Sequence, residues 1–333
     1  MRSSLDRRGR VPAVLGVFVG APISAEYLQA YLTSTGNARE MVAGLLILAP
    51  LYGGAALLIR EIAVRRGLGW TGILLLAAAF GLAMPGLVDL ALFAEHRADV
   101  AEWDQMRQPT LLAPLGISAY TTLTWVSGHI LMSIGAPLAV LDSLAPSYRN
   151  RPLLGRWGIV VLSVLWVLAA TLIRSDGVRM YHYRPSATQT IAVAAVVVLL
   201  AALAFTRIAR PVVHGDRQPI RLVWIVLAGV VGKLVLDLTP ANWAGVTVLV
   251  LLLGAAAIAV RRYATTKRWS ASQIGALAAG ALIGGTLIGF LAPIPPGVQP
   301  SAKLTQNALM VTAALAVAWL MVRRRPERQP CNQ

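Results

Sequence analysis

Apolar residues in this chain form continuous runs rather than alternating with polar ones. The runs are about 17–25 residues long, the length with which an α-helix crosses about 30 Å of hydrocarbon. Lipid offers the backbone no hydrogen-bond partners, so runs of this kind are typical of transmembrane helices. About ten spans are predicted, at residues 11–33, 41–59, 70–94, 117–143, 157–174, 188–206, 220–238, 241–260, 270–292 and 305–322. The predicted fold is an all-α polytopic transmembrane bundle, with residues 1–333 as a single transmembrane domain.

The few charged residues lie mostly between the apolar runs. Hydrophobic residues make up 57% of the 333 positions and charged residues only 13%, and the mean hydropathy is +0.66. A soluble domain has about a quarter of its residues charged, so a soluble fold is excluded. The net charge of +16 would suggest nucleic acid in a soluble protein. Here the basic residues flank apolar runs, so we expect the lipid bilayer as partner and no nucleic acid.

Lysine and arginine are distributed unequally between the two sets of links. The N-terminus, the links after the even-numbered spans and the C-terminus hold 22 of the 30 basic residues. The links after the odd-numbered spans hold 7, and Lys233 lies inside a span. The positive-inside rule then predicts that both termini are cytoplasmic. The composition resembles that of uncharacterised multi-pass integral membrane proteins of GC-rich bacteria, which implies the bacterial cytoplasmic (inner) membrane.

The first apolar run also has two features of a secretory signal peptide, a basic start and an apolar middle. Its small-residue cleavage pattern is poor, because Ile23 and Glu26 flank Ser24 and Ala25. We therefore expect a retained first helix rather than a cleaved leader.

Four ionisable side chains fall well inside predicted spans: Glu26, Asp89, His129 and Lys233. A charge at mid-bilayer costs roughly 2.5–3.5 kcal/mol on insertion scales, so such groups face the bundle interior, pair with one another or line a water path. The predicted threading puts His129 near the middle and the other three in the outer half. We predict that the four converge on one polar pocket that opens outward and handles protons or a ligand. The alternative for Glu26 and His129 is a purely structural role in helix packing.

Lys233 has a second interpretation. Asp237 follows it by four residues, so both side chains lie on one face of a helix. This spacing predicts an ion pair and a structural role for Lys233.

Prolines lie near three of these groups and in the middle of one further span, at Pro22, Pro85, Pro137 and Pro50. Each removes a helical hydrogen bond and kinks its helix. Kinked helices beside carboxylates are typical of midplane sites in transporters, although they also occur in bundles without a transport role. The predicted helix at 270–292 differs, because its glycines at 280, 284, 285 and 289 predict close packing inside the bundle.

Two short segments resemble a known family. Residues 60–67 read REIAVRRG and residues 125–129 read WVSGH. They resemble two motifs of the CAAX-protease and bacteriocin-processing family of intramembrane enzymes, whose fold is a multi-helix membrane bundle. The resemblance implies that Glu61 and His129 are catalytic groups that activate water or bind metal. Arg60 stands where that family has its first Glu, and the chain has no His-x-x-x-Asn.

Three functions remain open from the sequence. A transporter or permease-like protein with a buried polar site in the outer half fits the kinked helices, and it would handle a small solute or ion. A degenerate intramembrane metalloprotease-like enzyme and a non-catalytic membrane scaffold or complex subunit are the alternatives. We expect transport, with no catalytic residue, cofactor or metal, because the sequence has no nucleotide loop or dinucleotide fingerprint and only one cysteine, Cys331.

Overall fold

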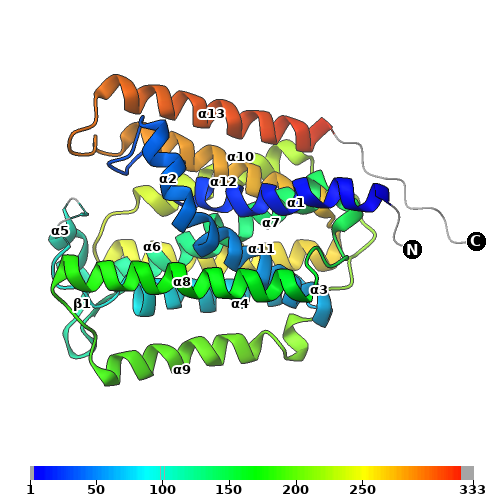
Figure 1. Cartoon of the computed structure of the whole chain (residues 1–333). Helices are drawn as coiled ribbons and strands as arrows, with labels where there is room; N and C mark the ends of the chain where they lie inside the picture. The colour runs from blue at the N-terminus through cyan, green and yellow to red at the C-terminus, as the bar shows by residue number, and fades with distance from the viewer. Residues whose placement is uncertain (1–3, 98, 101, 324–333) are drawn as a thin grey trace, which may run out of the picture.

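The computed structural model describes residues 4–97, 99–100 and 102–323. They form a bundle in which most helices run along one common direction (Figure 1). The longer helices are α1 (Ser4–Pro22), α2 (Ala38–Leu48), α3 (Ala55–Arg66), α4 (Trp70–Ala83), α6 (Ala119–Gly128), α7 (Ala136–Leu144), α8 (Arg156–Tyr181), α9 (Ala187–Leu203), α10 (Leu222–Leu238), α11 (Trp243–Thr266), α12 (Ala271–Leu291) and α13 (Pro300–Arg323). The short elements are α5 (Trp103–Arg107), the 3₁₀ turns Gln108–Thr110, Ala113–Leu115, Pro146–Tyr148 and Arg207–Ala209, and an antiparallel pair, β1 (Leu111–Leu112) and β2 (Ile117–Ser118). The predicted all-α bundle is confirmed.

Seven helices of the described residues are long and apolar enough to cross a membrane. They cover Ala38–Arg66, Trp70–Val88, Ala119–Leu144, Arg156–Tyr181, Trp243–Thr266, Ala271–Leu291 and Pro300–Met321. Helices α9 and α10 coincide with two further predicted spans but have only 17 residues each. The membrane-spanning character of the bundle is confirmed, and the number of ten spans stays a prediction.

Several predicted boundaries are wrong. The first helical segment ends at Tyr27 instead of residue 33, and the third ends at Val88 instead of residue 94. Ala30 and Leu90, just beyond these ends, have φ of +50° and +65°, a left-handed conformation that an α-helix cannot contain. Hydropathy could not reveal this, because both links continue in apolar residues. Asp89 therefore lies just outside a helix.

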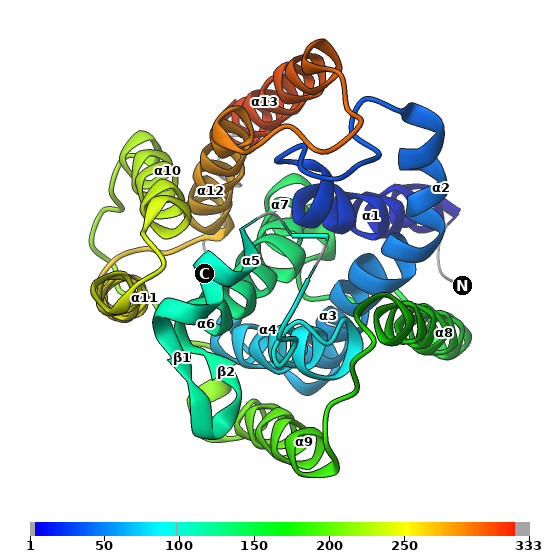
Figure 2. The same ribbon diagram turned by 90° about the vertical axis from the view of Figure 1, so that its left-hand side faces the viewer.

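The first and last helices of the described residues have their outermost ends on the same side of the bundle (Figure 1). Helix α1 begins and α13 ends there, and the links after α3, α7, α9 and α11 lie there too (Figure 1). We call this the terminal end. Helix α5 and the β1–β2 hairpin lie at the opposite end, which we call the hairpin end (Figures 1 and 2). Four of the basic residues, Arg2, Arg324, Arg325 and Arg328, and also Cys331 lie outside the described residues.

Four helical segments of the described chain contain a π-helical turn. These turns are η1 (Ile23–Tyr27), η2 (Ala49–Gly54), η3 (Met84–Val88) and η6 (His129–Gly135). Pro22 directly precedes η1, while Pro50 and Pro85 are the second residues of η2 and η3. Pro137 follows η6. Because proline has no backbone N–H, the carbonyl of Ser133, four residues earlier and inside η6, has no helical partner. Prolines thus account for the breaks in all four segments, as predicted, and each break takes π geometry.

Helix α12 packs tightly on α10, as its glycines predicted. A Cβ atom at Gly280 would lie 2.9 Å from the Cα of Gly229, and one at Gly284 would lie 2.9 Å from the Cβ of Lys233. Neither space admits a side chain, so the two backbones touch. By contrast, α8 and α11 bury only 6% and 11% of their apolar windows inside the protein. Their outer surfaces are the ones that a bilayer covers.

Candidate functional site

Glu26 lies in η1 and accepts two tyrosine hydroxyls. Tyr52, in η2, donates to its Oε1 atom, and Tyr31, in the link after η1, donates to Oε2. Hydroxyl donors to a carboxylate form charge-assisted hydrogen bonds, which are stronger than neutral ones. Tyr52 is buried whereas Tyr31 is exposed. The carboxylate is therefore held between the interior and the link at residues 28–37.

His129, the first residue of η6, stacks on the ring of the same tyrosine. The ring centroids of His129 and Tyr52 are 5.9 Å apart, with an interplanar angle of 25°. Phe80 meets His129 edge-on, at 5.9 Å and 77°. The Nδ1 atom of His129 lies 3.2 Å from the hydroxyl of Ser133. Tyr52 thus connects Glu26 to His129, and we call Glu26, Tyr31, Tyr52, Phe80 and His129 the Glu26 cluster.

Three members of this cluster come from the helix breaks. Glu26 lies in η1, Tyr52 in η2 and His129 in η6, while Asp89 directly follows η3. Such π-turns widen a helix locally and occur frequently at functional sites. The prolines therefore do more than bend four helical segments, because a polar group lies in or directly after each break.

Asp89 lies beside this cluster rather than inside it. Its Oδ1 atom accepts the backbone N–H of Ala91 at 2.8 Å. Burial raises the pKa of Asp89 from 3.8 to about 6; Arg97 opposes the shift, and the nearby Glu26 charge adds to it. The two carboxylates are therefore close enough to repel each other.

Asp89 is expected to make stability depend on pH. Because its folded-state pKa lies above the ordinary value, the folded protein binds this proton more tightly, and folding disfavours the ionised form. The protonated carboxyl group therefore contributes most to the free energy of unfolding below pH 3.8, and this contribution is lost as the pH rises through about 6.

The Asp89→Asn variant keeps a side-chain oxygen that can accept the backbone N–H of Ala91. We expect the variant to be more stable than wild type near about pH 8, with a difference that shrinks toward low pH. Unfolding in detergent across this pH range measures it, and a pH-independent difference would contradict the assignment.

Arg97, in the link between η3 and α5, has both polar and aromatic partners. Its guanidinium makes two hydrogen bonds to Asp99, at 3.1 and 2.6 Å, and donates to the hydroxyl of Tyr181 at 2.9 Å. It also lies 5.7 Å from the centre of the Trp103 ring. This arginine joins the link after η3 to the end of α8. The sequence placed it in a link and suggested no role for it.

Lys233 does not join the Glu26 cluster. Its ammonium donates to Oδ2 of Asp237, which confirms the predicted ion pair. The same oxygen accepts the side-chain amide of Gln29 at 3.2 Å. Lys233 is buried beside α12. The pair therefore holds the segment after η1 against α10, as the structural interpretation of Lys233 expected.

A second buried lysine, from α13, supports the same segment. Lys303 is 3% exposed and donates to the carbonyl oxygen of Ala30 at 2.9 Å. Gln306, one turn further, donates to the carbonyl of Tyr27 at 3.0 Å and accepts the N–H of Gly36 at 2.8 Å. A cation at the C-terminal end of a helix interacts favourably with the helix dipole. Helix α13 thus caps the broken end of the segment that carries Glu26.

Replacing Lys303 by methionine is expected to lower the free energy of unfolding by about 1.5–3 kcal/mol, the contribution of a hydrogen bond to a charged group. The carbonyl of Ala30 would also lose its partner. Lys267→Met is the matched control, because Lys267 lies in the link between α11 and α12 and its ammonium lies 5.3 Å from the centre of the Tyr263 ring. Equal losses in the two variants would contradict the capping role of Lys303.

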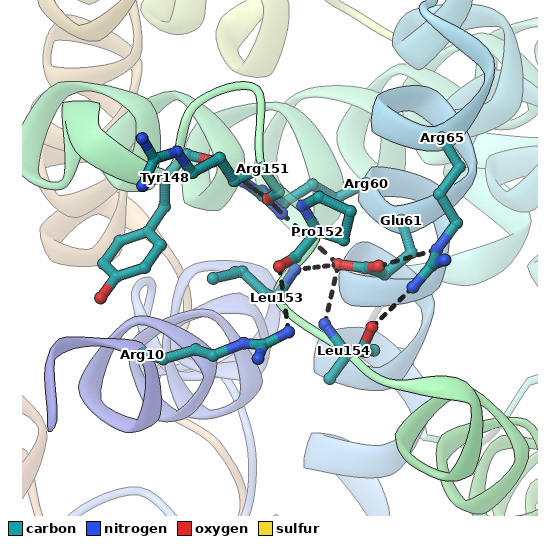
Figure 3. A network of polar contacts seen from close by, with 9 residues as sticks. All are labelled: Arg10, Arg60, Glu61, Arg65, Tyr148, Arg151, Pro152, Leu153 and Leu154. Atoms are coloured by element: carbon teal, nitrogen blue, oxygen red, sulfur yellow. Dashed lines mark hydrogen bonds and ion pairs between the residues drawn. The ribbon is translucent and has the colours of Figure 1, made fainter. Parts of the chain in front are cut away.

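Glu61 belongs to a different network, at the terminal end (Figure 3). It is 2% exposed, and its Oε1 atom accepts the backbone N–H groups of Leu153 at 2.5 Å and Leu154 at 3.1 Å. Arg65 donates to Oε2 at 3.1 Å and also binds the carbonyl of Leu154 at 2.6 Å. Arg60 donates to the carbonyls of Tyr148 and Arg151. These contacts fix the link between α7 and α8 on α3.

Glu61 and His129 do not belong to one common site. Among the described residues the two share no hydrogen-bond, ion-pair or ring partner, since Glu61 binds residues 60, 65, 153 and 154 and His129 contacts the Glu26 cluster and Ser133. No group of three or more His, Cys, Asp or Glu residues able to hold a metal occurs in the part of the chain that the structure describes. The contacts of Glu61 are those of a structural carboxylate.

Sequence reasoning missed the tyrosines. It singled out Glu26 and His129 but not Tyr31 or the central Tyr52, although Tyr52 follows Pro50 in a span that contains two adjacent glycines. A tyrosine inside a kinked apolar helix is a usable signal, because its hydroxyl needs a buried partner.

The comparisons with known proteins yielded one match. A model of an uncharacterized membrane protein family matches residues 19–324, which include the Glu26 cluster, Asp89, Lys233 and the Glu61 network. The comparisons with curated proteins and with solved structures found no match. The match covers most of the chain, so this multi-pass protein belongs to that uncharacterized membrane protein family.

Proposed function

We propose that the protein is a transporter or permease-like protein, and that the Glu26 cluster is its site for a proton, an ion or a small polar solute. One observation carries the proposal: three π-turns, from three separate helical segments, supply the connected groups Glu26, Tyr52 and His129. Broken helices that expose polar groups within a bundle are the usual construction of a transporter site.

The distribution of basic residues supports an orientation for this site. The predicted cytoplasmic segments correspond to the terminal end of the bundle, where the α3–α4, α7–α8, α9–α10 and α11–α12 links lie. In that orientation the hairpin end faces outward, and Tyr31 lies on the outer side of Glu26. The membrane is then the bacterial inner membrane, with both termini in the cytoplasm.

The hydrogen bonds of Glu26 suggest how binding would be coupled to movement. The ionised carboxylate accepts both tyrosine hydroxyls. Protonation turns one carboxyl oxygen into a donor, so one tyrosine must turn its hydroxyl to another acceptor. Tyr52 also stacks on His129, so this rearrangement would act on η2 and η6 together. A carboxylate that exchanges protons in this way would drive or gate solute movement.

Alternating access gives a test that needs no knowledge of the solute. Ser133 is 1% exposed and lies one turn beyond His129 toward the terminal end. Cys331 is first replaced by serine, so that the Ser133→Cys variant has a single thiol. This variant is placed in oriented vesicles and treated with a membrane-impermeant maleimide from either face. A transporter is expected to expose this thiol to each face in turn, and Glu26→Gln is expected to change the ratio of the two labelling rates.

The control is Thr286→Cys, which is fully buried in α12 and is expected to react from neither face. Labelling of Ser133→Cys from one face only would indicate a binding protein without transport. Absence of labelling from both faces would indicate a structural bundle. Either result would overturn the proposal.

A further inference from the structure

Asp142 is a buried carboxyl group that belongs neither to the Glu26 cluster nor to the Glu61 network. It lies on α7, within the apolar segment Ala119–Leu144, and it is 9% exposed. In the part of the chain that the structure describes, it has no hydrogen bond and no ion pair. An ionised carboxylate is costly to bury without partners, whereas the neutral acid costs much less. The surroundings of Asp142 therefore suit its protonated form.

Two arginines act on Asp142 electrostatically without binding it. They are Arg60, on α3, and Arg149, on the α7–α8 link. Arg60 directs its two Nη groups at the carbonyls of Tyr148 and Arg151 and leaves its buried Nε–H without a partner. One network thus contains a carboxyl group that lacks a donor and a guanidinium that has a donor to spare.

Other charged groups at this end of the bundle already have partners. Glu61 accepts two backbone amides of the α7–α8 link, and Arg10 on α1 donates to a carbonyl of the same link. Arg323 on α13 lies over a tryptophan ring. Helix α12, which packs against α7, contains no ionisable residue. Arg60 and Arg149 are therefore the cations that an ionised Asp142 would attract.

We propose that Asp142 is a pH-operated switch for the α7–α8 link. While Asp142 is protonated, Arg60 stays on the carbonyls of the turn at residues 148–151, as in the structure (Figure 3). When the proton leaves to the water at the terminal end, the carboxylate draws Arg60 and Arg149 onto itself through charge-assisted hydrogen bonds. Arg60 then releases the turn, while Glu61 still holds residues 153 and 154.

The low dielectric of the interior favours this exchange of partners. A carboxylate and a guanidinium attract each other several-fold more strongly inside a protein than in water, and a neutral carbonyl offers Arg60 no such attraction. The link lies at the terminal end, so the switch would respond to the pH on the predicted cytoplasmic side. It uses no group of the Glu26 cluster, so it stands whether or not the protein transports a solute.

Hydrogen–deuterium exchange of the full-length protein in lipid nanodiscs tests the switch. Exchange of the segment 145–155 is compared at about pH 5 and about pH 8, a range in which buried carboxyl groups ionise, after correction for the intrinsic pH dependence of exchange. In wild type we expect exchange about tenfold faster at the higher pH. This factor corresponds to one lost hydrogen bond with a charged group.

Two variants isolate the contribution of Asp142. Asp142→Asn keeps the shape of the neutral acid but cannot ionise, so its link is expected to exchange equally slowly at both pH values. Asp216→Asn is the matched control, because Asp216 is exposed in the α9–α10 link at the same end of the bundle. The control is expected to behave like wild type.

A third variant, Arg149→Gln, changes a partly exposed residue and tests the proposal even if Asp142→Asn does not fold. The carboxylate then lacks one of its two arginines, so the increase in exchange is expected to be smaller than in wild type. Equal exchange of the wild-type link at both pH values would overturn the proposal. So would an increase that persists in Asp142→Asn, or one that is unchanged in Arg149→Gln.

Discussion

Replacing Glu61 by alanine is expected to lower the free energy of unfolding by about 3–5 kcal/mol, the cost of removing one partner of a buried ion pair while the other stays buried. Arg60 is 3% exposed and would lose the carboxylate with which it forms an ion pair. The N–H groups of Leu153 and Leu154 would lose their acceptor at the same time. The α7–α8 link would then detach from α3.

Chemical unfolding in detergent measures this loss, and Glu95→Ala is the control because Glu95 is exposed in the link between η3 and α5. The experiment also separates two interpretations of Glu61. The protease resemblance implies a carboxylate that is free for chemistry, whereas the structure surrounds it with arginines and backbone donors (Figure 3). Unchanged stability in Glu61→Ala would contradict the structural role.

Gly53→Ala is expected to have the second large effect. A Cβ at residue 53 would lie 2.5 Å from the Cα of Phe18 and closer still to its carbonyl oxygen. The clash involves backbone on both sides, so no rotamer change relieves it. We expect a loss of about 3 kcal/mol, the upper end of the usual cost of overpacking.

This substitution also acts on the Glu26 cluster. Gly53 lies next to Tyr52 in η2, and Phe18 lies one turn before Pro22 in α1. Separating α1 from η2 would pull Tyr52 away from Glu26. Gly128→Ala is the control, because a Cβ at Gly128 meets nothing within 4 Å and alanine favours a helix. A Gly53→Ala protein as stable as the control would contradict the close approach of α1 and η2.

Much of this architecture follows from simple sequence patterns. Continuous apolar runs predicted the membrane bundle, and glycine spacing predicted that the helix at 270–292 packs closely inside it. The Lys233 and Asp237 pair followed from helical spacing alone. These features are local, because each depends on residues within a few turns of one helix.

The candidate site was only partly predictable, because it depends on contacts between helices. The prolines indicated where helices break, but not that the breaks would take π geometry and face one another. The convergence of Glu26 and His129 on Tyr52 joins residues 26, 52 and 129 of the chain, and no periodicity encodes it. The left-handed conformations of Ala30 and Leu90 likewise came from tertiary packing, since neither residue type favours them.

The contact between Glu26 and Tyr52 is the central claim, and a double-mutant cycle measures it most directly. The free energy of unfolding is determined for wild type, Glu26→Gln, Tyr52→Phe and the double variant. A charge-assisted hydrogen bond predicts a coupling energy of about 1.5–3 kcal/mol between the two sites. Effects that add to within about 0.5 kcal/mol would show that the two side chains do not interact, and the site would have no connection from Glu26 to His129.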